Sequence, residues 1–332
     1  MRYSQAYLRD FLPQADPPEG SVPGDVLDEA LLQLESSTSS DRAEEPVDRE
    51  LVARATRWTY AVFSELGLGR FTLDRYLPSF LSDRFWLDRG MSLGAHQAAS
   101  FGLFDEETGE RGLGIIISVP WRSEPWFEIV NYATFPRLGN ARFPVALRQS
   151  EIELHLGHPQ GATASCWAKC NLTSQWGFLT AGHAISGNRP GRSVPLAGGG
   201  SGTLIRSYYQ PVDAAFVQGA PPAPAPSRLP VLSFPAVGVP VDIQCQTGAL
   251  RRTVVEVTNN MGVLHTRGIG IYVYLDQPAS PGDSGALVRT ATGEAVAIYS
   301  GQMAAPASPA GLCGVAQNFE QAIFALGVTP YL

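Results

Sequence analysis

The second half of the chain is a succession of short apolar runs separated by turn residues. Alternating or apolar runs bounded by Gly, Pro, Asn and Asp are typical of β-strands, and many of them at roughly even spacing indicate a closed or sandwiched all-β domain. The sequence therefore predicts a mainly β fold class. The predicted strands are 164–170, 177–180, 202–208, 214–217, 240–246, 253–257, 263–275, 285–288 and 295–299.

A helix is expected near the end of the chain, within residues 317–328. Its apolar residues recur at i, i+3, i+4 and i+7, the spacing of one helix face. They are Phe319, Ala322, Ile323 and Leu326.

The region ahead of the β-rich half has a different pattern. Residues 51–66 carry apolar side chains at helical spacing, and 70–95 are expected to be helical in part. Strands are predicted at 114–119 and 127–132, with one or two more within 145–156. We therefore expect a smaller helical and α/β N-terminal region over residues 51–159.

The first fifty residues form an acidic arm. They hold twelve acidic residues and four arginines, a sum of −8, so the other 282 residues sum to +1. Residues 1–50 are expected to be partly disordered, with a short helix at 25–34 whose apolar stripe docks on its own protein or captures a partner helix.

Composition excludes several classes of function. The chain lacks a basic stripe that could neutralise phosphates, which argues against nucleic acid as a partner. No apolar run approaches the length of a membrane span, and the N-terminus shows no secretory signal, so we expect a cytoplasmic protein with no membrane partner.

The four cysteines are expected to be reduced thiols. Cys166 and Cys170 fall in one predicted strand, about 13 Å apart, which is too far for a disulfide. The same distance prevents both from reaching one tetrahedral zinc ion together with His155 and His158. We therefore expect no metal and no cofactor.

Three short motifs carry chemistry. His183 follows the apolar strand 177–182, and Asp213 lies at the start of another apolar strand. Ser284 lies in a turn between two glycines. A serine hydroxyl is a poor nucleophile unless a neighbouring base takes its proton, and imidazole can do so near neutral pH. A carboxylate such as that of Asp213 would fix the imidazole tautomer.

Two further features of the serine turn fit acyl transfer. Gly282 allows the backbone to point its N–H and that of Ser284 into one space, which would form an oxyanion hole. Asp283 is expected to be buried and to need a partner. Asp242 and Asp276 are rival third members of the triad, although both follow a proline-rich joint. Asp276 is expected to be a solvated turn acid, the alternative being that it favours a basic residue before the cleaved bond.

The motifs LTAGH (179–183) and GDSGA (282–286) closely resemble those of the chymotrypsin/trypsin-like serine peptidases, and VDAAFV (212–217) resembles the aspartate motif of that family. The resemblance is to a bacterial-type trypsin-like peptidase domain over residues 160–332, with an N-terminal extension. It implies a two-barrel fold with a C-terminal helix and the site between the barrels. It also implies that Tyr299, Ser300 and Gly301 form one wall of the substrate cleft.

The sequence thus predicts a serine endopeptidase that cleaves protein or peptide substrates through an acyl-enzyme. Ser284 would be the nucleophile, His183 the general acid/base and Asp213 the orienting acid. Residues 1–160 would regulate access or bind an activating or recruiting protein. The alternative is a catalytically silent, peptidase-like scaffold that binds proteins, because no activation site of the animal-zymogen type is evident.

Overall fold

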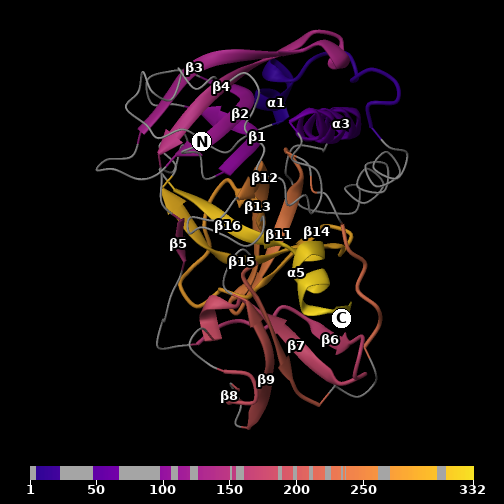
Figure 1. Ribbon diagram of the computed structural model, residues 1–332, viewed down its shortest axis with the longest axis vertical. Coiled ribbons are helices and arrows are strands. Elements are labelled where there is room, and N and C mark those ends of the chain that lie inside the picture. Colours follow the sequence, from indigo (N-terminus) through magenta and orange to yellow (C-terminus); the bar gives the residue numbers. More distant parts are fainter. Residues whose placement is uncertain are drawn as a thin grey trace.

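A computed structural model gives the fold (Figure 1). It describes residues 5–22, 48–66, 98–105, 111–119, 126–149, 152–154, 161–185, 189–196, 200–208, 212–220, 226–232, 235, 237–260, 270–304 and 312–332. Within that part of the chain, no helix is long and apolar enough to cross a membrane.

One barrel is built from the later strands of the chain. Its six strands are hydrogen-bonded in the order β11-β14-β15-β16-β13-β12, and a further pairing of β12 with β11 closes the ring. The strands are β11 (Pro240–Cys245), β12 (Gly248–Asn260), β13 (Gly270–Leu275), β14 (Leu287–Thr290), β15 (Ala295–Ala304) and β16 (Leu312–Asn318). Fully buried apolar side chains such as Val241, Val273 and Val315 fill this barrel.

A second six-stranded sheet, in the order β17-β6-β7-β10-β9-β8, lies at the opposite end of the molecule from the N-terminal strands (Figure 1). Its strands are β6 (Trp167–Cys170), β7 (Trp176–Thr180), β8 (Ser193–Pro195), β9 (Ser201–Tyr208), β10 (Ala214–Gln218) and β17 (Val328–Tyr331). Along β6 the burial alternates with the period of two expected of a strand that has one face in a core.

Helix α5 (Phe319–Leu326) connects the first barrel to this six-stranded sheet, which is the second barrel of the two-barrel fold. The side chain of Asn318 caps its first turn by accepting from the Gln321 amide, and Gly327 ends it in the left-handed conformation at φ 65°. The helix contacts β15 and β16 of the first barrel and β10 and β17 of the second. Of the predicted apolar face, Phe319, Ala322 and Leu326 are buried and Ile323 is half-buried, and the polar Gln321 is buried as well.

The N-terminal strands extend the sheet of the first barrel. They are β1 (Ala98–Asp105), β2 (Arg111–Val119), β3 (Trp126–Phe135) and β4 (Ala141–Gln149), and a short 3-10 helix, η2 (Pro136–Leu138), joins the last two. Strand β1 pairs with the second half of β12, so the sheet continues from the barrel through β1, β2, β4 and β3. Strands β2 and β4 are parallel, and the other pairs are antiparallel.

Two helices cover this extension. Helix α3 (Arg49–Glu65) packs on β1, and α1 (Gln5–Phe11) contacts α3 and β2. Leu8 and Leu12 are buried in the same core as the first barrel. Residues 5–22 are therefore docked on the protein, held also by the Trp58 indole N–H, which donates to the Ala15 carbonyl at 2.8 Å.

The mainly β fold class and the C-terminal helix predicted from the sequence are confirmed. Strands β1, β8, β16 and β17 were not predicted, and the helix begins at Phe319 because the preceding residues belong to β16. The predicted helix at 25–34, the segment 70–95 and most of the proline-rich joint (221–225) lie outside the described residues. The domain boundaries at residues 50 and 159 stay predictions.

Candidate active site

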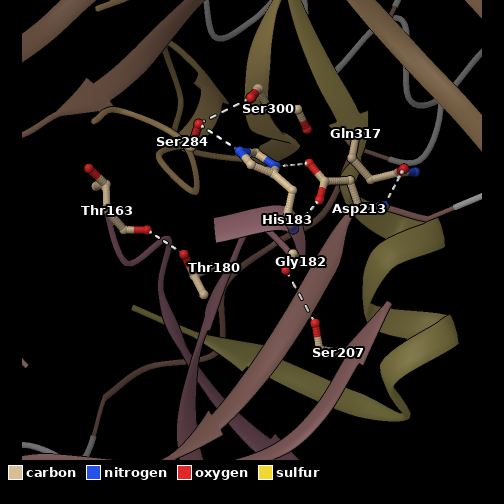
Figure 2. A network of polar contacts seen from close by, with 9 residues as sticks. All are labelled: Thr163, Thr180, Gly182, His183, Ser207, Asp213, Ser284, Ser300 and Gln317. Atoms are coloured by element: carbon tan, nitrogen blue, oxygen red, sulfur yellow. Dashed lines mark hydrogen bonds and ion pairs between the residues drawn. The ribbon is translucent and has the colours of Figure 1, made fainter. Parts of the chain in front are cut away.

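His183 and Asp213 meet at the end of the second barrel that faces the first. His183 begins the 3-10 helix η3 (His183–Ile185) directly after β7, and Asp213 immediately precedes β10. Asp213 Oδ2 lies 2.8 Å from His183 Nδ1, and Asp213 Oδ1 accepts from the His183 backbone N–H, also at 2.8 Å (Figure 2). Because an ionised carboxylate only accepts, this contact places the ring proton on Nδ1 and leaves the Nε2 lone pair free to act as a base.

Ser284 approaches the imidazole from the first barrel. Its Oγ lies 3.1 Å from His183 Nε2 and 3.1 Å from the Ser300 carbonyl oxygen (Figure 2). The hydroxyl has one proton, so it can donate to either acceptor at a time. All three triad side chains are buried, with exposed fractions of 2% for His183, 0% for Asp213 and 2% for Ser284.

The structure thus places the hydroxyl, the imidazole and the carboxylate in one line between two barrels that share a C-terminal helix. The fold is chymotrypsin-like. The solved structures to which the chain is similar include serine proteases.

Three of these serine proteases illustrate the similarity. The Nocardiopsis protease is 23% identical, with 52% of this chain and 98% of that chain covered and a TM-score of 0.39. A glutamic acid specific serine protease is 21% identical over 51% and 93% of the two chains, with a TM-score of 0.40. A chymotrypsin from Cellulomonas bogoriensis is 21% identical over 51% and 97%, with a TM-score of 0.35. No family model and no curated protein matches the sequence.

In this chymotrypsin-like fold, glycines let the backbone pass where a side chain has no room. A Cβ on Gly182, next to the histidine, would lie 1.7 Å from the Tyr208 carbonyl oxygen. A Cβ on Gly285, next to the serine, would lie 2.1 Å from the Thr163 carbonyl oxygen, and Gly285 also has a φ of +94°. Both positions therefore require glycine.

The turn before Ser284 is shaped for two amide donors. Gly282 adopts a φ of +98°, a conformation that favours glycine. Within the described chain, neither the Gly282 N–H nor the Ser284 N–H donates to a backbone acceptor. The predicted oxyanion hole at these two residues is therefore compatible with the backbone of this turn.

Asp283 is buried, as expected, and its partners include two backbone amides. Its Oδ2 accepts from the Ser280 N–H at 3.1 Å, and its Oδ1 accepts from the Gln246 N–H at 3.4 Å. Burial, and then the charge of Asp283 and a hydrogen bond to it, raise the pKa of Cys245 to about 12. The thiol beside the turn is therefore protonated at neutral pH.

A buried amide pair behind Asp213 was missed by sequence reasoning. Gln317 Oε1 accepts from the Asp213 backbone N–H at 3.1 Å, and Gln317 Nε2 donates to the Ile271 carbonyl oxygen at 3.0 Å and to Gln321 Oε1 at 2.7 Å. The Ile271 N–H in turn donates to Gln321 Oε1 at 2.7 Å. Nothing in the local pattern distinguishes these glutamines from surface residues; only the fold brings them to the triad.

The two rival acids are elsewhere. Asp242 Oδ2 accepts from Arg251 Nη1 at 3.2 Å. Asp276 is 6% exposed, and its Oδ1 accepts from the Thr253 N–H at 2.9 Å. The expectation that Asp276 is a solvated turn acid is therefore wrong, because the carboxylate is needed to satisfy a strand amide.

The predicted cleft wall, Tyr299 to Gly301, is the middle of β15. Tyr299 is fully buried, and its hydroxyl accepts from the Ala279 N–H at 2.9 Å. Ser300 is the residue whose carbonyl accepts from Ser284, and Gly301 follows it.

A metal site is not evident in the described residues: no three His, Cys, Asp or Glu side chains there are grouped so that they could hold an ion. All four cysteines, Cys166, Cys170, Cys245 and Cys313, are free thiols. The His155 and His158 of the zinc alternative lie outside the described residues.

Proposed function

We propose that the chain is a serine endopeptidase that hydrolyses peptide bonds in protein substrates. The observation that carries this proposal is the 3.1 Å approach of Ser284 Oγ to His183 Nε2, with the Asp213 carboxylate 2.8 Å behind the ring. A hydroxyl within hydrogen-bond reach of an oriented imidazole is the arrangement that nucleophilic catalysis requires.

The chemistry follows from the positions of these atoms. Ser284 Oγ attacks the substrate carbonyl carbon as His183 Nε2 takes the hydroxyl proton, and the carbonyl oxygen becomes negatively charged. The Gly282 and Ser284 amides donate to that oxygen, where each donor contributes about 2.7–4 kcal/mol to the transition state. The C–N bond then breaks as His183 gives the proton to the leaving amine, which leaves an acyl-Ser284 ester.

Water completes the cycle. His183 removes a proton from a water molecule, whose oxygen attacks the ester carbonyl; the ester bond breaks and the proton returns to Ser284 Oγ. No other reactant is needed. Asp213 remains ionised throughout and stabilises the imidazolium in each half of the reaction.

The proposed substrates are peptides and proteins, and residues 1–160 are proposed to control their access. We also propose a cytoplasmic location, which the four free thiols support.

Labelling with an alkyl fluorophosphonate tests the proposal. Wild type should form a covalent adduct on Ser284, Ser284→Ala should form none, and His183→Ala should react much more slowly. Ser201→Ala, an exposed position on β9, is the matched control and should label like wild type. A folded wild-type chain that never labels would instead support the silent scaffold that binds proteins.

A further inference from the structure

A short strand from the N-terminal region lies against the predicted cleft wall. Strand β5 (Ile152–Leu154) pairs antiparallel with β15, with Leu154 opposite Gly301, Glu153 opposite Gln302 and Ile152 opposite Met303. It is outside the closed ring of the barrel, and β15 is its pairing partner in the described chain.

Strand β5 occupies the same edge of β15 as the serine turn. Along this edge, β14 pairs with the start of β15. The next contact on the same edge is the hydrogen bond that the Gly285 N–H donates to the Tyr299 carbonyl at 2.8 Å. Ser284 Oγ then contacts the Ser300 carbonyl, and β5 takes the next residues, 301–303. The opposite edge of β15 is filled by β16 as far as Ala304.

A bulge in β15 marks the junction between the serine and β5. The register of β15 with β16 shifts between Tyr299 and Gly301, so Ser300 is the extra residue. Bulges of this kind re-aim a residue beside an active site. Here the bulge falls at the residue whose carbonyl meets Ser284, immediately before the positions that pair with β5.

The direction of β5 carries the chain toward the triad. Because β5 is antiparallel to β15, Leu154 is its residue nearest to Ser300, and the chain leaves β5 in the direction of Ser284. Where the described chain resumes, the Thr163 N–H donates to the Ser284 carbonyl at 2.8 Å and its hydroxyl donates to the Gly282 carbonyl at 3.0 Å. Leu154 and Thr163 therefore both pair with residues next to or within the serine turn.

We propose that β5 occupies the edge on which an extended peptide substrate pairs, so that the chain inhibits itself. A sheet edge with unpaired N–H and C=O groups is a template for an added strand, and an extended peptide is the partner it fits. An incoming peptide would pair antiparallel with 301–303 and present its next residue to Ser284. This inference rests on the proposed peptidase function and names the control of that same site.

In the inhibited state β5 pairs with the edge of β15, and in the active state a substrate peptide pairs with the same edge. Strand β5 has three residues, which is the lower limit of the usual strand length, so a longer peptide can compete with it for this edge. Because β5 competes for the edge, only molecules whose edge is free can bind an extended substrate. The apparent affinity for that substrate is therefore the intrinsic affinity multiplied by the fraction of molecules whose edge is free. A reagent too small to reach residues 301–303 does not compete with β5.

A proline in β5 tests this in the full-length chain. Glu153→Pro removes a backbone donor and should weaken the pairing, as proline does in strands. The matched control is Ser193→Pro in β8, which is also a three-residue edge strand but lies in the other sheet. Each variant is assayed with three reagents. The long substrate is the peptide that wild type cleaves best in a peptide library, and the short substrate keeps only the residue of that peptide that precedes the cleaved bond. The third reagent is the alkyl fluorophosphonate.

We expect the Glu153→Pro substitution to change the reaction with the long peptide but not the reactions with the two short reagents. Glu153→Pro should raise kcat/KM for the long peptide, through a lower KM, by about tenfold if the edge is free in about a tenth of wild-type molecules. The short substrate and the fluorophosphonate should react at wild-type rates, and Ser193→Pro should change none of the three. An unchanged or lower kcat/KM for the long peptide, with normal labelling, would overturn the inference while leaving the peptidase proposal intact.

Hydrogen exchange on wild type gives an answer that does not depend on a variant folding. A peptidyl phosphonate bound to Ser284 should speed exchange at the amides of 152–154 and keep those of 301–303 protected, whereas the alkyl fluorophosphonate should leave 152–154 protected. If 152–154 stay protected beside the bound peptide, β5 is a permanent structural strand and the inference is wrong. If Ser284 accepts neither reagent, the peptidase proposal fails and this inference fails with it.

Discussion

The Tyr299 hydroxyl accepts a hydrogen bond from the Ala279 amide at 2.9 Å and thereby connects strand β15 to the loop that carries Ser284. Tyr299 is fully buried, and this burial raises the pKa of its hydroxyl above the ordinary value. One phenol therefore fixes the distance between the strand that would hold a substrate and the turn that would attack it.

Tyr299→Phe tests this connection. The Ala279 amide would lose its acceptor, and a buried unsatisfied donor costs about 1–3 kcal/mol. We expect the free energy of unfolding, measured in urea, to fall by that amount and kcat/KM to fall because the serine turn is less fixed. Tyr208→Phe, at an exposed side chain, is the control and should change neither quantity. Equal stability of Tyr299→Phe and wild type would show that the hydroxyl does not hold the loop.

Gln317 should matter to activity although it is not a member of the triad. Gln317→Met leaves the Asp213 amide and the Ile271 carbonyl without the partners described above, at about 1–3 kcal/mol for each buried group. We expect a lower melting temperature and a lower kcat, with the pH dependence of kcat/KM also changed because the carboxylate behind His183 is less fixed. Gln218→Met, at a partly exposed position on β10, should leave all three unaltered. A stability loss with an unchanged pH profile would limit Gln317 to a structural role.

Gly182→Ala should disrupt the histidine end of the site. The new methyl group would lie 1.7 Å from the Tyr208 carbonyl oxygen, so the backbone of β9 or of the histidine turn must move. Overpacking of this kind costs about 1–3 kcal/mol or more, and fluorophosphonate labelling of Ser284 should slow with the displaced ring. Gly219→Ala is the matched control, because its methyl group would meet only the Phe178 ring at 3.8 Å. Normal labelling of Gly182→Ala would show that the turn adapts without moving His183.

The cap of α3 should make part of the stability depend on pH. Asp48 Oδ1 accepts from the Leu51 N–H at 3.1 Å and its Oδ2 accepts from Arg9 at 2.8 Å. The Leu51 amide, and then Arg9, lower the pKa of Asp48 below its ordinary value of 3.8. A carboxyl whose pKa is lower in the folded state stabilises the fold above the unfolded-state pKa, and this contribution is lost as the pH falls through the folded-state value.

Asp48→Ala should therefore destabilise the protein by about 1 kcal/mol at pH 7, the usual cost of losing a cap. The difference from wild type should shrink as the pH is lowered below 3.8. Asp48→Ser keeps a capping oxygen and loses the ion pair with Arg9, so it should cost less. Urea unfolding between pH 2 and 7 measures all three proteins, and a constant difference across that range would contradict this account.

The residues of the proposed triad could be predicted because each lies in a local motif. LTAGH and the PGDSGA turn contain the glycines that the backbone needs at those points, so the sequence pattern and the steric requirement coincide. The strand pattern also predicted β15 and the apolar face of α5. These features depend on spacing along a few consecutive residues, which a sequence displays directly.

What could not be predicted depends on contacts between distant segments. Gln317 reaches Asp213 across 104 positions of sequence, and no local pattern distinguishes a buried amide from an exposed one. Strand β5 was expected only as a possible second strand within 145–156, and its pairing with β15 follows from where the chain is carried in space. The buried Asp276 was misjudged for the same reason, because its partner amide at Thr253 belongs to another strand.

The arrangement of β12 also bears on how the protein is made. Its first half pairs with β11 and its last residues, 256–260, pair on that same edge with β1. Synthesis proceeds at about 5–20 residues per second. Strand β1 therefore leaves the ribosome on the order of ten seconds or more before the end of β12, with which it pairs. For that interval the nascent chain presents an unfinished sheet, so we expect it to be a client of holding chaperones, and fragments that end before residue 260 to aggregate.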